Sequence, residues 1–292
     1  MAFPALNDYL ARLGDAPSAS ASVWRSADGR VHEQFFNCTL TSAFQPIHAL
    51  GADGAAPAAL EALARGASGH DAGLSLWRML DHAASDDQSV ELDRLCRMLH
   101  AINFFRQAEA GDGDLYLSVH DRLLSAVSSN HGYAFRRILA ALGLPAERIV
   151  LQLPAVGAAS RWLANYVADN YRRNGFRLAF NAASIADAMD AIGQFQPHAV
   201  KIDARVLRDG AALPALLELA QGAGVTVIVK RLDSAAGRAL IERAAAHSGA
   251  TAWAQGYLMD TPRAALSALR QGPLPAAPPT RTARGDEVGQ GA

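Results

Sequence analysis

Short apolar runs alternate with longer segments of helical pattern along most of the chain. Six runs rich in Val, Ile, Leu or Phe, followed by a weaker seventh, cover residues 44–50, 115–119, 149–153, 178–180, 199–202, 226–229 and 252–258. Several of them lack the alternation of a half-solvated strand, so we expect strands that are buried on both faces. Such strands are typical of a parallel sheet covered by helices.

Between these runs the apolar residues recur at helical spacing. Residues 90–105 place their apolar side chains on one face and offer Asp93 and Arg97 as an i,i+4 ion pair on the other. Two later helices are expected to end at Gly175 and Gly249, because glycine accepts the left-handed conformation of a helix C-cap.

The alternation predicts one α/β domain. Over roughly 230 residues it fits a (β/α) barrel, whose usual length is about 250 residues. A doubly wound open sheet fits the same pattern. Residues 1–34 are expected to form a short helix and a linker, residues 35–272 the barrel, and the proline-rich residues 273–292 a disordered tail.

The composition of the chain and the motifs that it lacks exclude several classes of protein. The 27 basic and 28 acidic residues nearly cancel, which argues against a nonspecific nucleic-acid binder. No signal peptide and no apolar run long enough for a membrane span is visible, so we expect a soluble, cytoplasmic protein. Cys38 and Cys96 lie outside any CxxC motif, which favours a reducing compartment. The GxGxxG, P-loop, HExxH and GxSxG motifs are absent.

Four segments, taken in order, resemble the signature segments of the EAL domain family. Residues 44–47 (FQPI) resemble the family's YQPI, and residues 61–65 (EALAR) its EALLR. Residues 199–203 (AVKID) resemble the "vKID" strand, and residues 255–258 (QGYL), followed by Pro262, resemble QGYlfsrP. Each motif is weak alone, but their order, their spacing and their positions near predicted strands identify the chain as an EAL-like protein.

The resemblance implies a modified TIM (β/α)8-type barrel with its active site at the C-terminal ends of the strands. The family hydrolyses cyclic di-GMP to linear pGpG with two Mg²⁺ or Mn²⁺ ions and a bridging water. Two hard cations need carboxylate oxygens to offset their charge. Held close together, they activate the water and stabilise the developing charge on the phosphate.

Most of the metal site that the resemblance implies is replaced in this sequence. The family's metal-binding positions fall on Glu61, Ser118, Gln152, Asn181, Ala182 and Lys230. Glu61, Lys201, Gln255 and Asp233 match catalytic-site positions but are expected to be vestigial. Because Glu61 and Asp233 are the only acids left against Lys201 and Lys230, these positions carry no net charge, and we expect no metal cofactor. We also hypothesise that Lys230 lies near Glu61 as a substitute for a lost metal, or else extends to solvent.

The resemblance also suggests residues that touch a nucleotide. They are Gln45, Pro46, Leu63, Arg65, Asp203, Gln255 and Pro262. Each has a structural interpretation as well: a turn for Gln45 and Pro46, core packing for Leu63, a surface charge for Arg65, and a helix cap for Asp203.

The leading hypothesis is a catalytically inactive regulatory module of bacterial cyclic di-GMP signalling, which acts through an unknown protein partner with or without nucleotide binding. The alternative is an active cyclic di-GMP phosphodiesterase of an unusual subtype that uses Mg²⁺ or Mn²⁺. A third hypothesis is another (β/α) enzyme that carries the motifs by chance. By resemblance a homodimer is expected. The helix at residues 90–105, with Phe104 off its main face, is a candidate surface for it, and a core helix is the more common alternative.

Overall fold

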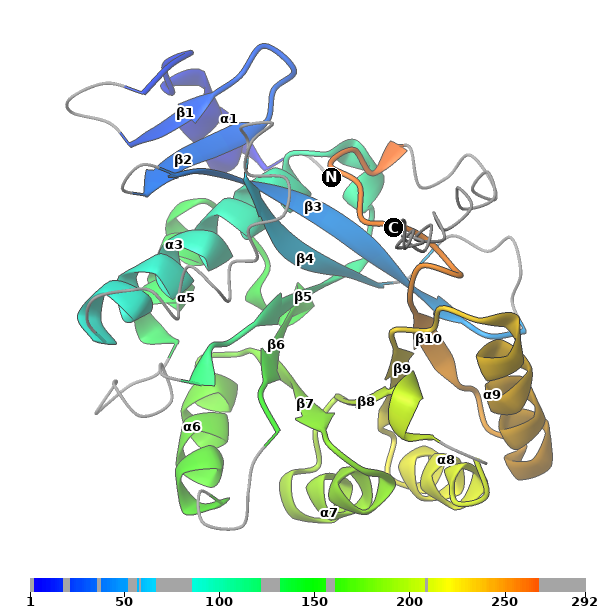
Figure 1. Ribbon diagram of the computed structural model, residues 1–292. Helices are drawn as coiled ribbons and strands as arrows, with labels where there is room; N and C mark the ends of the chain where they lie inside the picture. The colour runs from blue at the N-terminus through cyan, green and yellow to red at the C-terminus, as the bar shows by residue number, and fades with distance from the viewer. Residues whose placement is uncertain are drawn as a thin grey trace, which may run out of the picture.

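In the computed structural model a ten-stranded sheet curls until it closes on itself (Figure 1). The structure describes residues 3–17, 22–35, 38–51, 57, 59–66, 86–121, 132–155, 161–207 and 210–267. The strand order is β1-β2-β3-β10-β9-β8-β7-β6-β5-β4, and an additional pairing joins β3 to β4. This pairing closes β3 to β10 into an eight-stranded barrel, which confirms the predicted fold and rules out the open sheet.

The strands are β1 Val23–Arg25, β2 Val31–Phe35, β3 Cys38–Ala49, β4 Ala59–Gly66, β5 Asp114–Ser118, β6 Ile149–Leu153, β7 Arg177–Ala182, β8 Ala199–Asp203, β9 Thr226–Lys230 and β10 Trp253–Gln255. The α-helices are α1 Pro4–Ala11, α3 Asp86–Phe105, α5 Tyr133–Ala141, α6 Arg161–Arg173, α7 Ile185–Phe195, α8 Leu213–Gly222 and α9 Ala235–Ser248. Short 3₁₀ helices are η1 Ala108–Ala110, η2 Ala146–Arg148 and η4 Ala204–Val206.

All seven predicted runs contain strands, but the pattern did not predict β1, β2 or β4. β4 is rich in alanine, which has a low preference for strands, so only its family motif marks it. β1 and β2 extend the sheet beyond β3 within residues 1–34, where a helix and a linker were expected. The helix is present as α1. β3 runs antiparallel to its two neighbours within the barrel, β4 and β10, which distinguishes this barrel from an all-parallel one.

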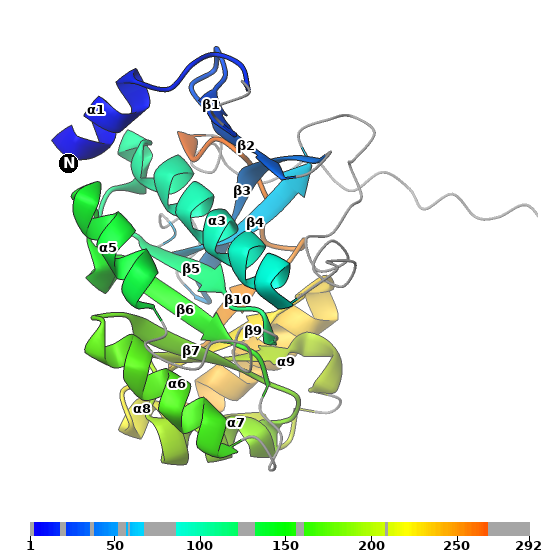
Figure 2. The ribbon, with the colours of Figure 1, turned by 90° about the vertical axis from the view of Figure 1, so that its left-hand side faces the viewer.

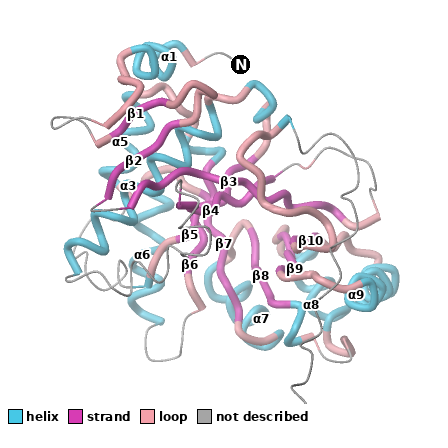
Figure 3. The backbone as a smooth tube through the Cα atoms, turned by 45° about the horizontal axis from the view of Figure 1, so that its top comes forward, coloured by secondary structure: helices cyan, strands magenta, loops and turns pink. Residues whose placement is uncertain are grey.

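The barrel has two apolar cores. One lies inside it and takes a single side chain from each strand: Ile47, Ala59, Tyr116, Val150, Ala179, Ala199, Ile228 and the partly buried Trp253. The other lies between the strands and the surrounding helices. Figure 3 shows the barrel strands with helices α3 and α5 to α9 packed around the outside. Because side chains alternate between the two faces of a strand, each strand feeds both cores.

The glycine caps formed as predicted. Gly175 follows α6 with φ of 82°, and Gly249 closes α9 with φ of 66°. The side chain of Asp203 caps η4 by accepting a hydrogen bond from the backbone N–H of Arg205 at 2.9 Å, which confirms its structural interpretation.

The structure confirms one expectation for α3, apart from its exposure, and corrects another. The Asp93–Arg97 ion pair exists, at 2.5 Å, but both side chains are about 95% buried, because α5 packs against α3 at this point and Arg97 lies over the ring of Phe135. Phe104 is also fully buried, beside Phe44, so it cannot contribute to a dimer surface. Figure 2 shows α3 lying along the barrel wall.

None of the described helices is both long enough and apolar enough to cross a membrane. The predicted tail, residues 273–292, lies outside the described residues.

Candidate functional site

Eight side chains, one from each barrel strand, form a polar ring at the mouth of the barrel. Each lies two residues beyond the residue that its strand gives to the inner core, toward the C-terminal ends of the parallel strands; in the antiparallel β3 it lies two residues before. The polar ring consists of Gln45, Glu61, Ser118, Gln152, Asn181, Lys201, Lys230 and Gln255. It contains one carboxylate and two ammonium groups, so its net charge is +1.

Glu61 is at the centre of the ring's hydrogen bonds. Its Oε2 accepts from Lys201 Nζ at 2.8 Å and from Gln255 Nε2 at 2.7 Å. Its Oε1 accepts from Gln152 Nε2 at 2.9 Å, and Ser118 Oγ lies 3.5 Å away. Lys201 Nζ also donates to Gln255 Oε1 at 2.9 Å, so the carboxylate, the ammonium and the amide form a closed triangle.

This environment fixes the charge of Glu61. Burial disfavours a carboxylate, but the Lys201 ammonium and the hydrogen bonds from Lys201, Gln152 and Gln255 outweigh it and lower the pKa of Glu61 to about 2. Glu61 is therefore ionised at neutral pH and is neutralised by a side chain of the same protein.

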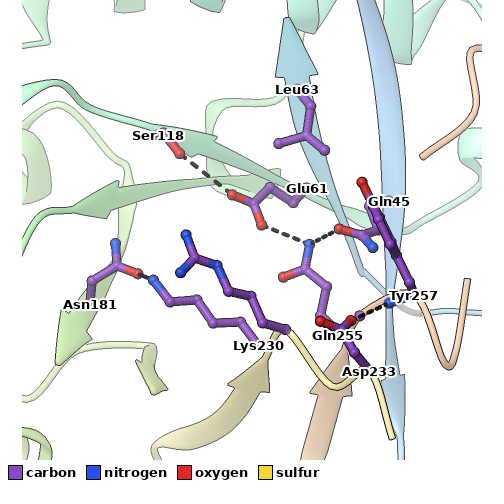
Figure 4. A pocket seen from close by; sticks show the side chains of 11 residues that line it. Gln45, Glu61, Leu63, Ser118, Asn181, Lys230, Asp233, Gln255 and Tyr257 are labelled. Atoms are coloured by element: carbon purple, nitrogen blue, oxygen red, sulfur yellow. Dashed lines mark hydrogen bonds between the residues drawn. The ribbon is translucent and has the colours of Figure 1, made fainter. Parts of the chain in front are cut away.

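Lys230 has a different partner from the one hypothesised. Its ammonium donates to Asn181 Oδ1 at 2.5 Å (Figure 4). Asn181 Nδ2 in turn donates to the carbonyl of Leu153 at 3.0 Å. The hypothesised pairing with Glu61 is wrong, because Lys201 occupies that position. Burial, followed by repulsion from Lys201, lowers the pKa of Lys230.

A cavity of about 500 Å³ opens above the ring. Its lining consists of Gln45, Glu61, Leu63, Ser118, Asn181, Lys230, Arg231, Asp233, Gln255, Gly256 and Tyr257. Asp233 Oδ1 accepts a hydrogen bond from the backbone N–H of Tyr257 at 3.2 Å, so it also has a structural partner. Figure 4 shows Glu61, Lys230 and Gln255 converging on this space.

Gly256 has a steric reason to be glycine. A Cβ atom there would lie 2.2 Å from the backbone N of Leu232. Hydrogen bonds from Leu232 N to Gln255 O and from Leu258 N to Leu232 O, each 3.0 Å long, hold the two segments together. The QGY motif is therefore held against the segment that follows β9, and there it lines the cavity.

The residues expected to touch a nucleotide fall into two groups. Gln45, Leu63 and Gln255 line the cavity. Pro46, Arg65, Asp203 and Pro262 do not belong to its lining. Arg65 donates to the carbonyl of Ala64 at 2.9 Å, and Asp203 is paired with Arg205 at 2.7 Å and with Arg231 at 3.0 Å.

The positions that correspond to metal ligands are also divided. Ala182 packs in the apolar core between the strands and the helices, whereas the other five positions belong to the polar ring. Within the described part of the chain, no group of three or more His, Cys, Asp or Glu side chains is arranged to hold a metal ion.

Sequence reasoning assigned no role to Arg231. This residue lines the cavity and has a φ of 57°, which is unusual for a residue other than glycine. In the sequence, only its position between Lys230 and Asp233 could have indicated that Arg231 belongs to the site.

The comparisons with known proteins agree with this geometry. The model of the EAL domain family matches residues 29–262. Bacillus subtilis YkuI, solved with substrate c-di-GMP and calcium, is 20% identical, with a TM-score of 0.60 over 77% of this chain and 56% of that chain. A standalone EAL protein from Vibrio cholerae O395, in its c-di-GMP-bound form, is 18% identical, with a TM-score of 0.60 over 78% of this chain and 94% of that chain. Klebsiella pneumoniae BlrP1, in a manganese/cy-diGMP complex, is 20% identical, with a TM-score of 0.62 over 80% of this chain and 58% of that chain.

The chain therefore spans little more than half of the YkuI and BlrP1 chains. No curated protein matches it.

Proposed function

Because the chain belongs to the EAL domain family, we propose that it is a catalytically inactive member that acts as a regulatory module in cyclic di-GMP signalling. In this role the barrel binds cyclic di-GMP without hydrolysing it and presents its surface to a protein partner. The proposal concerns this domain alone, since the chain covers only part of several of its structural neighbours.

The observation that carries the proposal is the internal neutralisation of Glu61. Both carboxylate oxygens already accept hydrogen bonds, and a cation lies 2.8 Å from Oε2. A divalent ion bound to Glu61 would either be repelled by the Lys201 ammonium, which is 1% exposed, or have to displace it. Removing one partner of a buried ion pair leaves the other charge unpaired and is strongly unfavourable.

The remaining donor set does not fit a pair of metal ions. Mg²⁺ and Mn²⁺ prefer carboxylate oxygens, and two ions side by side need several of them. The polar ring supplies one carboxylate, and its net charge is +1 before any ion arrives. Gln152 directs its amide N–H₂ toward Glu61, and the Asn181 Oδ1 oxygen is already used by Lys230.

The shape of the mouth supports ligand binding. Small-molecule sites usually enclose roughly 300–1,000 Å³, and the cavity of about 500 Å³ lies within that range. Gln45, Leu63 and Gln255, three of the residues expected to touch a nucleotide, line it. The related structures named above were solved with cyclic di-GMP, which makes this dinucleotide the first ligand to test.

Calorimetric titration with cyclic di-GMP, in EDTA and in Mn²⁺, tests the proposal when a hydrolysis assay runs in parallel. We expect binding in EDTA and no formation of pGpG in Mn²⁺. Turnover in Mn²⁺ that the Glu61→Gln variant lacks would contradict the proposal and support an active phosphodiesterase. If cyclic di-GMP binds neither in EDTA nor in Mn²⁺, the ligand-binding part of the proposal fails. Only a role through protein contacts would then remain.

A further inference from the structure

The two lysines of the polar ring differ in what they contact. Lys201 pairs with a carboxylate, whereas among the residues that the structure describes Lys230 donates only to the neutral amide oxygen of Asn181. Lys230 forms no ion pair with any described carboxylate. Its positive charge therefore stays uncompensated at short range while it lines the cavity.

Asn181 holds the Lys230 ammonium in place. Its Nδ2 is bound to the carbonyl of Leu153 at 3.0 Å, which directs its Oδ1 toward Lys230. One of the three ammonium protons is used in this contact, so two remain for a ligand. A compact ammonium with free donors is a good point-charge partner for a phosphate oxygen.

A second cation lies next to it on the cavity wall. The side chain of Arg231 is 59% exposed and is tethered through Nη1 to Asp203 Oδ2 at 3.0 Å. Its left-handed backbone, with φ of 57°, is unfavourable for a residue other than glycine. Strained residues of this kind cluster at ligand-binding sites, where the surrounding structure maintains them.

The lysine content of the chain supports a specific role. Of the 27 basic residues, 25 are arginines and only two are lysines. Both lysines belong to the polar ring, at positions 201 and 230. A chain that uses arginine everywhere else thus places one lysine, Lys201, at a position where the family also has lysine, and the other, Lys230, at a position where the family has a metal ligand.

We propose that Lys230, assisted by Arg231, binds a phosphate group of the ligand directly, so that phosphate recognition in this barrel requires no metal ion. The proposal rests on the proposed function for the identity of the ligand, a phosphodiester of a dinucleotide. The site itself recognises the phosphate anion.

The acidic residues of the cavity do not oppose this arrangement. Lys201 neutralises Glu61, so the negative potential that Glu61 produces near Lys230 is reduced. Asp233 accepts a hydrogen bond from Tyr257 N. Glu61, Asp233, Lys230 and Arg231 cancel within the lining. Beside it, Lys201 and Arg205 outweigh Asp203, the carboxylate that pairs with Arg231, so one positive charge remains in excess for an anion.

Calorimetry in EDTA with cyclic di-GMP tests the role of Lys230. We expect Lys230→Met to weaken binding about 10- to 100-fold, the loss of one charge-assisted hydrogen bond. Lys230→Arg should retain part of the affinity, because it keeps the charge. Arg243→Met, which removes an exposed cation from α9 outside the cavity lining, should bind like the wild type. Thermal unfolding checks that each variant is folded.

A second probe separates this inference from the proposed function. With lysine labelled by ¹³C, the protein gives only two lysine Cε signals, and the Lys230→Arg variant assigns them. We expect pyrophosphate in EDTA to shift the Lys230 signal more than the Lys201 signal. If cyclic di-GMP does not bind but pyrophosphate gives this shift, the anion site stands and the nucleotide function fails.

Two results would overturn the inference. In the first, Lys230→Met binds cyclic di-GMP as tightly as the wild type, so the proposed function survives without this site. In the second, neither cyclic di-GMP nor pyrophosphate affects the Lys230 signal.

Discussion

Glu61 at the barrel mouth and Glu33 in the N-terminal strand β2 are both withdrawn from water, with 15% of the Glu61 side chain and 1% of Glu33 exposed. Lys201 and its neighbours hold the pKa of Glu61 at about 2. For Glu33, burial and the nearby Glu91 raise the pKa to about 7. Its Oε1 accepts no hydrogen bond from the described residues.

The difference between these regions shows that a partner, and not the degree of burial, decides whether a buried carboxylate carries charge. At the mouth the partner is an ammonium supplied by the protein itself. Under the proposed function, this explains how Glu61 can remain charged without a metal ion. It also predicts that the two regions respond oppositely to mutation and to pH.

The largest effect is expected for Lys201→Met, which leaves Glu61 buried without its cation. Breaking a buried pair in this way should lower the free energy of unfolding by about 3–5 kcal/mol. The pKa of Glu61 should rise toward that of Glu33. Chemical denaturation at pH 7 measures the first effect, and NMR titration of the Glu61 carboxyl carbon the second. An unchanged stability would mean that the pair contributes nothing.

Acid should remove the contribution of Glu61 next. Its folded-state pKa, about 2, lies below the ordinary value of 4.5. Its stabilisation is therefore complete above pH 4.5 and is lost as the pH falls toward 2. The total loss is on the order of 3 kcal/mol. The slope of unfolding free energy against pH in this window should be shallower in Glu61→Gln. Equal slopes in the two proteins would contradict the low pKa.

Glu33 should behave in the opposite way. Its folded-state pKa of about 7 exceeds the ordinary 4.5, so it favours the folded state at low pH and loses that contribution as the pH rises from 4.5 to 7. Glu33→Gln should be more stable than the wild type at pH 8, by on the order of 2 kcal/mol, because the amide carries no charge but remains buried. Denaturation at pH 5 and pH 8 tests this. A variant that is destabilised at pH 8 would show that Glu33 has a cationic partner.

The smallest change is expected for Lys230→Met, the same substitution at the other lysine of the ring. Within the described part of the chain, the Lys230 ammonium hydrogen-bonds only a neutral amide, and burial already disfavours its charge. The loss of Lys230 should therefore change the unfolding free energy by less than about 1 kcal/mol. This variant is the matched control for Lys201→Met. A loss as large as that of Lys201→Met would mean that both lysines support the fold equally.

Much of the fold could be predicted because its signals are local. Apolar runs marked the strands, and glycines marked the helix ends. β4 escaped because alanine carries no strand signal, and its role depends on pairing with β3 and β5. The polar ring follows a period of two within each strand, but the register of eight strands is needed to see it as a ring.

The partner of Glu61 could not be predicted from spacing. Lys201 and Lys230 each lie two residues beyond an inner-core residue, so the sequence treats them alike. The barrel decides between them, because it brings Lys201 within 2.8 Å of Glu61 and places Lys230 beside Asn181. The left-handed backbone of Arg231 also depends on its tertiary surroundings.

Counting bound Mn²⁺ tests the central claim most directly, namely that Lys201 and not a metal ion neutralises Glu61. Electron paramagnetic resonance reports free Mn²⁺ while the wild-type protein is added in increasing amounts at neutral pH. The account predicts that the free-ion signal persists and is the same for the wild type and Glu61→Gln. Uptake of two ions per chain by the wild type, absent in Glu61→Gln, would contradict it.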